Sequence, residues 1–356
     1  MLFDPFVLRG VTLRNRIGVS PMCQYSSQDG FADDWHLVHL GSRAVGGAGL
    51  VIAEATAVEA RGRISPQDLG LWKDEHVEPL ARVARFVRAQ GAAPGLQLAH
   101  AGRKASVSRP WDGDKPLDPP HGWAPIVAPS AIAFGPGYQT PVALDGPGLA
   151  QVIAAFGAAA ARTMRAGFEV LEIHAAHGYL IHEFLSPVTN RRDDDWGGTF
   201  DNRVRLAVEI VRAVRRVVPD ALPLLMRLST TDWLDGVSGG GWTVEDSIAL
   251  ARRLKGEGVD LVDCSSGGIA PGIRIDAGPG YQVPNAARIR AEANIPTAAL
   301  GFITSATQAE QTLRAGAADL VFLARELLRD PYWPLRAARE LRAPVAAPVQ
   351  YLRAWR

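Results

Sequence analysis

Eight short runs rich in apolar and β-branched residues recur along the chain, and this repetition constrains the fold more than any other feature. The runs span residues 16–20, 50–55, 95–100, 168–174, 222–228, 258–265, 295–301 and 318–324. Several are apolar almost throughout, which is typical of parallel strands covered on both faces. Amphipathic stretches lie between them, at residues 77–89, 148–166, 202–218, 244–256 and 305–315. We therefore predict a (β/α)₈ barrel rather than a doubly wound open sheet, because no Gly-x-Gly-x-x-Gly turn follows the first run.

Composition excludes several classes of protein. The chain has 356 residues, 47% hydrophobic and 21% charged, which is enough apolar material for a large core and excludes a disordered chain. One barrel accommodates this length, so we expect a single domain over residues 1–356. The 38 Lys and Arg balance 37 Asp and Glu, for a net charge of +1, so no overall field attracts nucleic acid or an anionic membrane.

The cysteines and the apolar runs indicate a cellular location. Cys23 and Cys264 cannot form a disulfide framework, which fits a reducing compartment. The N-terminus lacks the basic and apolar regions of a signal peptide, and the longest apolar run, residues 152–161, is too short to span a bilayer. We expect a cytoplasmic protein.

Two segments depart from a plain barrel. Residues 6–13 alternate in the manner of a small hairpin, which we expect to cap the N-terminal mouth of the barrel. Residues 105–141 hold eight of the 25 prolines and follow the third run, so they would lie over the C-terminal end of the strands. This second segment also carries aromatic residues with which to pack, namely Trp111, Trp123, Phe134 and Tyr138. We predict that it is a lid.

Candidate functional residues were selected by their position at the C-terminal ends of the runs, where barrel enzymes place their active sites. The set comprises Ser20, Pro21, Met22, Cys23, Tyr25, Ala55, Gln97, His174, His177, Tyr179, Arg227, Ser266, Gly267, Gly268, Gly301, Ala324 and Arg325. We expect all of these except Tyr25, His177 and Tyr179 to contact a cofactor.

The histidine pair has two interpretations. His174-x-x-His177 is a weak signal by spacing alone, because His36 and His39 repeat the spacing within a predicted helix, where a structural role is expected. A metal site would need a third ligand at a neighbouring strand end, and the sequence offers only Cys23, flanked by Pro and Met. We expect no metal, and keep a metal-dependent barrel hydrolase or lyase using His174 and His177 as the alternative.

A phosphate-bearing cofactor accounts for other members of the set. Gly267, Gly268, Gly301 and Ala324 follow the last three runs, where barrels often bind phosphate through loop amides. Arg325 adds a bidentate donor.

A flavin ring would suit the remaining positions. Gln97 can pair with the pyrimidine edge, and Arg227 can stabilise the negative charge that accumulates there on reduction. Small Ala55 and Pro21 would let the ring lie flat, and Cys23 would tune its electronic properties.

These residues carry a resemblance to a known family. The whole chain resembles the old yellow enzymes, in particular the thermophilic-like subclass of FMN-dependent ene-reductases. The matching segments are Asn15-Arg16-Ile17, Ser20-Pro21-Met22-Cys23-Gln24-Tyr25, Gln97-Leu98-Ala99-His100-Ala101-Gly102-Arg103-Lys104, His174-Ala175-Ala176-His177-Gly178-Tyr179-Leu180 and Arg325-Glu326-Leu327-Leu328-Arg329-Asp330-Pro331, together with residues 54–58 and 197–203.

The resemblance implies an NADPH dehydrogenase with non-covalent FMN and a ping-pong cycle. A reduced nicotinamide, usually NADPH, reduces the flavin, and an activated alkene such as an α,β-unsaturated ketone or aldehyde, a maleimide or a nitroalkene then takes its place. In this family His174 and His177 bind the substrate oxygen, hydride passes from flavin N5 to the β-carbon, and Tyr179 protonates the α-carbon. Cys23 modulates the flavin potential, and Tyr25 contacts the substrate.

The C-terminal tail, about residues 345–356, also resembles the subclass. There the arginine that matches Arg353 reaches into the active site of a neighbouring subunit, which implies a homodimer or homotetramer. Phe302 stands where some relatives carry Trp, so the shape of their substrate pocket is not transferred to this chain.

Overall fold

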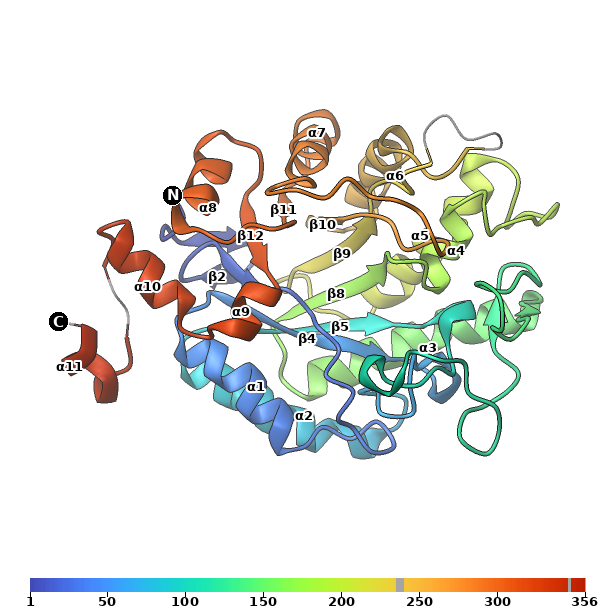
Figure 1. Ribbon diagram of the computed structural model, residues 1–356, viewed down its shortest axis with the longest axis horizontal. Coiled ribbons are helices and arrows are strands. Elements are labelled where there is room, and N and C mark those ends of the chain that lie inside the picture. Colours follow the sequence, from blue (N-terminus) through green and yellow to red (C-terminus); the bar gives the residue numbers. More distant parts are fainter. Residues whose placement is uncertain (235–239, 345–346, 356) are drawn as a thin grey trace.

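Eight parallel strands close into a barrel in this computed structural model, which describes residues 1–234, 240–344 and 347–355 (Figure 1). The strands are β3 (Ile17–Val19), β4 (Leu50–Ala57), β5 (Ala93–Ala99), β8 (Val170–Ala175), β9 (Leu224–Ser229), β10 (Leu261–Ser265), β11 (Thr297–Ala299) and β12 (Leu320–Leu323). Each pairs in parallel with the next, and β12 pairs with β3 to complete the ring. The predicted (β/α)₈ barrel is confirmed, with each strand inside or within two residues of a predicted run.

Helices surround the barrel. They are α1 (Asp34–Val45), α2 (Val77–Ala89), α3 (Gly146–Arg165), α4 (Leu180–Leu185), α5 (Phe200–Arg215), α6 (Val244–Gly256), α7 (Val283–Ala293), α8 (Ala306–Arg314), α9 (Arg325–Arg329), α10 (Trp333–Glu340) and α11 (Leu352–Trp355). In α3, the Asp145 side chain caps the first turn by accepting a hydrogen bond from Gly148 N. Leu149, Val152 and Phe156 form its buried stripe against the outer face of the strands. The five predicted amphipathic stretches and the predicted helix around His36 and His39 are all helical, whereas α4, α7, α9, α10 and α11 were not predicted.

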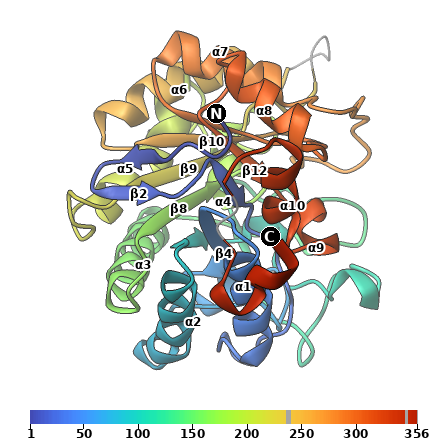
Figure 2. The same ribbon diagram turned by 90° about the vertical axis from the view of Figure 1, so that its left-hand side faces the viewer.

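The N-terminal hairpin fills one end of the barrel. Strands β1 (Phe6–Leu8) and β2 (Val11–Leu13) pair antiparallel, and Figure 2 looks onto the end of the molecule where they lie. Their buried side chains Leu8, Val11 and Leu13 form one cluster with the first inward-facing side chains of the barrel strands. Those strand residues include Leu50, Ile52, Ala93, Val170, Leu225, Leu261, Ala298, Leu320 and Phe322. The predicted cap is confirmed.

The barrel interior changes from apolar to polar toward the C-terminal ends of its strands. Successive side chains of a strand point to opposite faces, so the residue two beyond an inward apolar one also points inward. Two residues beyond Val170, Leu225 and Leu261 stand Glu172, Arg227 and Asp263. The strand alternation therefore places a charged layer directly above the apolar one.

A β-bulge interrupts β4 beside this layer. The register with β5 shifts between Ala53 and Ala55, so Glu54 is the extra residue on the bulged strand. Its carboxylate Oε1 accepts a hydrogen bond of 2.9 Å from Gln24 N, in the segment that follows β3. The bulge thereby holds the segment that carries Cys23 and Tyr25.

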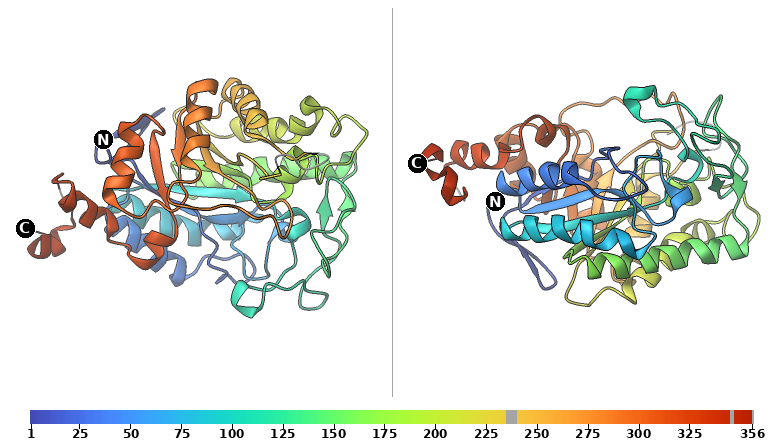
Figure 3. Two further views of the ribbon diagram at one scale, coloured as in Figure 1. Left: turned by 45° about the horizontal axis from the view of Figure 1, so that its top comes forward. Right: turned by 90° about the horizontal axis from the view of Figure 1, so that it is seen from below.

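The predicted lid covers the other end of the barrel. It contains one turn of 3₁₀ helix (Pro110–Asp112) and strand β6 (Val127–Ala128), which pairs in parallel with β7 (Val142–Ala143) just beyond it. The Trp123 indole donates to Arg61 O at 3.0 Å, and the Trp111 ring meets the Tyr25 ring edge-on at 5.8 Å. Figure 3 shows the lid at the end of the molecule away from both termini.

The C-terminal tail projects from the opposite end (Figures 1 and 3). One 3₁₀ turn (Val349–Tyr351) leads into α11, on which Arg353 is exposed. Residues 345–346 and 356 of the expected tail lie outside the described residues. Among the helices that the structure describes, none combines the length and apolar character needed to cross a membrane.

Candidate active site

A charged layer crosses the barrel interior below its open end. Gln97 Nε2 donates to Glu172 Oε1 at 2.7 Å, and Arg227 Nη1 donates to Ser20 Oγ at 3.0 Å. Arg227 Nε also lies 3.2 Å from Asp263 Oδ2. Burial raises the pKa of both carboxyls, and repulsion from Asp263 adds to the rise at Glu172. With a proton on Glu172, Arg227 and Asp263 form a matched pair that fixes a guanidinium under the site.

The turn after β8 brings three rings together. The His174 ring centroid lies 5.1 Å from those of both His177 and Tyr179, and the rings are nearly perpendicular. His177 has a φ of 60° and Gly178 a φ of 73°, so the backbone turns sharply between the strand and α4. A Cβ on Gly178 would lie 2.1 Å from Gly268 O, so this close approach requires glycine.

Both imidazoles are neutral at neutral pH. Burial lowers the pKa of His174 and of His177, and the Arg227 charge lowers both further. His174 Nδ1 accepts a hydrogen bond of 3.3 Å from Ala176 N, which leaves its hydrogen on Nε2. His177 Nε2 lies 2.6 Å from Ser265 Oγ. The site therefore presents His174 Nε2–H as a donor without a positive charge.

The hydroxyl of Tyr179 stays protonated. Burial raises its pKa well above 10, and burial likewise raises the pKa values of the Cys23 thiol and of Tyr25. These three side chains pack against an apolar cluster that contains Ile64 and Ala101. Tyr179 is thus a proton donor rather than a phenolate over the physiological pH range.

Lys104 joins the turn to the lid. Its Nζ donates to His177 O at 2.8 Å and lies 5.0 Å from the Tyr179 ring centroid and 4.8 Å from that of Phe134. Burial lowers the pKa of Lys104 to about 8. A cation that is easily neutralised therefore lies over the proposed proton donor.

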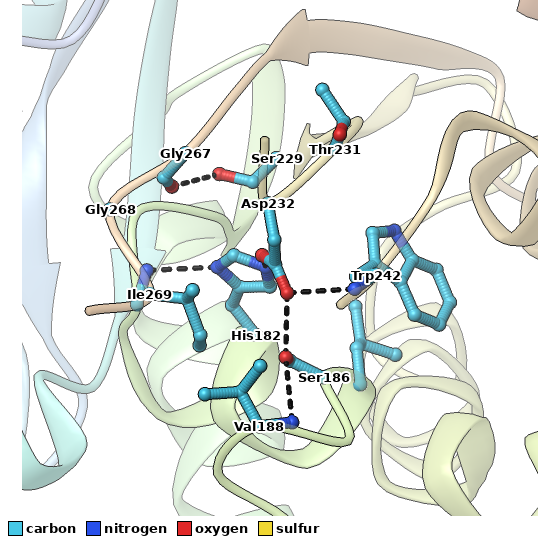
Figure 4. Close-up of polar contacts among 12 residues, drawn as sticks. His182, Ser186, Val188, Ser229, Thr231, Asp232, Trp242, Gly267, Gly268 and Ile269 are labelled. Carbon is cyan, nitrogen blue, oxygen red and sulfur yellow. Dashed lines mark hydrogen bonds and ion pairs between the residues drawn. The ribbon is translucent and has the colours of Figure 1, made fainter. Parts of the chain in front are cut away.

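A buried histidine–aspartate pair supports the same turn from below (Figure 4). Gly178 N donates to His182 Nδ1 at 2.9 Å, and His182 Nε2 lies 2.9 Å from Asp232 Oδ1, with both side chains fully buried. Asp232 Oδ2 accepts from Ser186 Oγ at 2.6 Å and from Trp242 N at 2.7 Å. Burial alone would raise the pKa of Asp232, but the neighbouring His182 ring and these hydrogen bonds outweigh it and lower the pKa.

Ser229 ties the turn to the loop after β10 (Figure 4). Its Oγ accepts a hydrogen bond of 2.9 Å from His177 N and donates one of 2.7 Å to Gly267 O. A Cβ on Gly268 would lie 2.7 Å from the His177 backbone. Loops that follow β8, β9 and β10 are therefore locked to one another around the two histidines.

One cavity runs from this turn to α9. It encloses about 740 Å³ of empty space, with His177 at one end and Arg325 at the other. Its lining also includes Ser265, Ser266, Tyr281, Gln282, Gly301, Phe302, Thr304, Ala324 and Arg329. The Arg325 guanidinium lies 4.6 Å from the Phe302 ring centroid. Gln282 Nε2 donates to Ser266 Oγ at 2.7 Å, whereas Gln282 Oε1 is buried without a partner.

The structure brings most of the predicted residues to this end of the barrel. Ser266, Gly301, Ala324 and Arg325 line the cavity, whereas Gly268 packs against the His177 backbone and Gly267 O accepts the hydrogen bond from Ser229 Oγ. Ser20, Gln97 and Arg227 lie in the charged layer, Pro21 and Met22 are half-buried after β3, and Ala55 lies in a smaller cavity with Tyr179. Arg353 is exposed on α11, away from the barrel mouth of its own chain. In the described part of the chain, no three His, Cys, Asp or Glu side chains converge to hold a metal ion.

Several site residues were not predicted from the sequence. Glu172 and Asp263 stand two residues before His174 and Ser265, so the period of two along each strand could have identified them. Lys104 stands four residues after the third run and could have been found by its position. His182 and Asp232 carried no signal, because the chain separates them by 50 residues and only the fold pairs them.

Comparisons with known proteins agree on one family. The model of the NADH:flavin oxidoreductase / NADH oxidase family matches residues 1–343. An NADPH dehydrogenase of Geobacillus sp. (strain WCH70) is 51% identical over 358 residues, covering 100% of this chain and 99% of the relative. One from Bacillus subtilis (strain 168) is 47% identical, covering 99% of both chains. The solved structure of morphinone reductase superposes with a TM-score of 0.78 at 28% identity, covering 97% of this chain and 90% of that one.

Proposed function

The chain belongs to the NADH:flavin oxidoreductase / NADH oxidase family, and from this premise we propose that it reduces carbon–carbon double bonds conjugated to a carbonyl or nitro group. It is an NADPH-dependent flavin oxidoreductase with FMN as cofactor, in agreement with the resemblance to the old yellow enzymes. One observation carries the substrate class: two neutral imidazoles and a protonated phenol meet at the barrel mouth. Reduction of a conjugated alkene needs donors to its oxygen and a proton for its α-carbon.

The residues around the long cavity fit FMN. Arg325 stands at one end as a phosphate ligand and, among the described residues, it forms no ion pair. The unpartnered Gln282 Oε1 offers an acceptor to a polyol chain, and a Cβ on Gly301 would lie 3.0 Å from the Tyr281 ring. Gln97 and Arg227 offer a polar edge and a cation to a flavin ring. When bound, FMN supplies reversible two-electron chemistry between NADPH and the substrate.

The histidines bind the substrate oxygen. As the double bond is reduced, negative charge grows on this oxygen, and a fixed N–H donor stabilises it more than it stabilises the ground state. His174 Nε2–H is such a donor, and His177 provides the second ring. The positive charge of Arg227 adds to this stabilisation from below. Tyr179 then gives its hydroxyl proton to the α-carbon.

Cys23 and Tyr25 complete the substrate side. The buried Cys23 is a neutral thiol, which tunes the potential of a flavin through its polarisable sulfur. Tyr25 lies beneath Trp111 of the lid, where it contacts the substrate. A metal-dependent hydrolase or lyase, the alternative from the sequence, would leave the long cavity and Arg325 without a role.

Spectroscopy tests the proposal directly. Purified protein is expected to be yellow from bound FMN, to bleach with NADPH in the absence of oxygen, and to regain its colour on addition of 2-cyclohexenone. Addition of the saturated cyclohexanone is the matched control and should leave the protein bleached. Flavin that is reduced by NADPH but is reoxidised by oxygen alone, and by no activated alkene, would overturn the substrate class.

We also propose a homodimer or homotetramer in which Arg353 reaches the active site of the neighbouring subunit. Arg353 is exposed, and Figure 1 places α11 at the end of the molecule opposite the lid, so this side chain can serve only another copy of the site. Such a guanidinium would bind substrate across the interface.

Replacement of Arg353 by alanine tests this assembly. Loss of one charge-assisted hydrogen bond, about 1.5–3 kcal/mol, should raise the KM for the alkene roughly tenfold or more while FMN stays bound. Steady-state kinetics at fixed NADPH measure the change. Arg339→Ala, which removes an exposed arginine from α10, is the control. An unchanged KM in Arg353→Ala would contradict a role for the tail in the neighbouring site.

A further inference from the structure

A second, smaller cavity lies behind Tyr179. It is small, with room for about one ordered water molecule. The lining is formed by Ala55, Ala57, Gly62, Ile64, Asp68, Ala99, Ala101 and Tyr179. Asp68 and Tyr179 carry the polar side chains of this lining, so they are the natural partners of a water held there.

Asp68 has one oxygen available for such a water. The residue is 3% exposed, and its Oδ2 accepts a hydrogen bond of 2.6 Å from Ile64 N. Its Oδ1 is buried and has no partner among the described residues. An unpaired buried carboxyl oxygen is costly unless water or a proton satisfies it, and the cavity can supply the water. Arg63, Pro66 and Gln67 of the same loop are partly exposed, so solvent is near.

The acids around Asp68 differ in strength. Burial raises the pKa of Asp68 to about 7 and that of Glu54 to about 8. Burial also raises the pKa values of Cys23, Tyr25 and Tyr179 far above neutrality. Asp68 and Glu54 are therefore the two acids of the group with a pKa near neutrality, and of these two Asp68 is the one that lines the cavity.

Two cations face this group of acids. Arg63 lies near Asp68 and favours its ionised form, although burial outweighs the attraction. Lys104 lies on the other side, 5.0 Å from the Tyr179 ring centroid. Neither makes an ion pair with Asp68 in the described structure, so the carboxyl is free to take up and release a proton.

We propose that Asp68 supplies Tyr179 with a proton through a water in this cavity, so that carboxyl, water and phenol act as one relay. This inference rests on the proposed role of Tyr179 as proton donor. As the Tyr179 O–H bond breaks toward the α-carbon, the water gives a proton to the phenolic oxygen and takes one from Asp68. The carboxylate left on Asp68 recovers its proton from solvent, and no electrons are exchanged. The relay avoids a bare buried phenolate, which this apolar surrounding strongly disfavours.

Asp68→Asn tests the relay, because the amide oxygen can still accept from Ile64 N. We expect the variant to slow the reoxidation of reduced enzyme by alkene roughly 10- to 100-fold and to leave reduction by NADPH unchanged. The wild-type rate should be highest while Asp68 is protonated and should fall as pH rises above about 7. The variant should show no such fall.

The number of protons that move during reoxidation distinguishes a relay through Asp68 from a purely structural role of this residue. In mixtures of H₂O and D₂O, the wild-type reoxidation rate should depend on deuterium fraction with curvature, because more than one proton moves. Asp68→Asn should give a straight line. Glu54→Gln is the matched control, since it removes another buried carboxyl that does not line the cavity, and it should keep the curvature. Loss of curvature in the control, or its retention in Asp68→Asn, would overturn the relay.

Infrared spectroscopy measures the protonation state of Asp68 in the resting enzyme, without turnover. A wild-type holoenzyme labelled with ¹³C-aspartate should show a protonated carboxyl band that disappears with a midpoint near pH 7. Tyr179→Phe should shift this midpoint, because it removes the far end of the water chain, and this measurement does not require Asp68→Asn to fold. An unshifted midpoint, or a carboxyl ionised throughout pH 5–9, would contradict the relay. Fast alkene reduction by Tyr179→Phe would instead refute the donor role in the proposed function.

Discussion

Replacing Tyr179 by phenylalanine is expected to slow the reoxidation of the enzyme by an activated alkene by roughly 10²- to 10⁴-fold. The phenol is half-buried and protonated, and its ring centroid lies 5.1 Å from that of His174, so it lies beside the proposed site of the substrate oxygen. Phenylalanine keeps the ring and its packing but removes the acid. Reduction by NADPH needs no proton from this residue and should stay within about threefold of wild type. Anaerobic stopped-flow absorbance of the flavin measures both half-reactions.

Tyr138→Phe is the matched control for this experiment. Tyr138 belongs to the lid and packs edge-on against Phe134. The substitution therefore removes a hydroxyl near the site without changing the histidines. It should leave both half-reactions unchanged. Equal slowing of both half-reactions in Tyr179→Phe would show that the variant disturbs the site as a whole, and would argue against Tyr179 as the acid.

Asp232→Ala is expected to lower the free energy of unfolding by about 3–5 kcal/mol, because it leaves His182 and two other buried donors without their acceptor. The substitution also frees Ser186 Oγ and Trp242 N from their shared acceptor. Since His182 receives the hydrogen bond from Gly178 N, the turn that carries His177 should loosen as well. Urea denaturation of the holoenzyme with excess FMN measures the stability, and alkene reoxidation measures the effect on the turn.

Measuring the free energy of unfolding over a range of pH tests the direction in which Asp232 affects stability. The pKa of Asp232 is lowered in the folded chain, so its stabilising contribution is present above its ordinary pKa and is lost as pH falls through the lowered value. The stability difference between wild type and Asp232→Ala should therefore shrink in acid. Asp201→Ala, which breaks an exposed pair with Arg253, is the control and should cost at most about 1 kcal/mol. A similar loss in both variants would contradict a special role for the buried pair.

The barrel could be predicted from the sequence because its signals are local. Each strand is a short apolar run, and helices such as α2 show a continuous buried stripe formed by Leu80, Val83, Ala84 and Val87. Helix α7 escaped prediction because its buried stripe is short, with Ala286, Ile289 and Ala293. Few large apolar residues recur at helical spacing in this segment, so its hydrophobic periodicity is hard to detect.

The site was predictable only in part, for a related reason. Residues at strand ends, such as His174 and Arg227, could be named because the barrel itself sends strand ends to one place. Asp68 lies in a loop after β4, and its proximity to Tyr179 depends on how that loop folds back. No spacing in the sequence encodes such a contact.

The hairpin at the base of the barrel has a consequence for the order of events. Leu8, Val11 and Leu13 close that end of the barrel with apolar side chains. Among the described residues, the interior is therefore open only at the opposite end, under the lid. On the proposed function, nicotinamide and alkene would both approach the same histidines from this end of the barrel. One molecule would then have to leave before the other could bind. Steric exclusion, as well as chemistry, would therefore make the two half-reactions alternate.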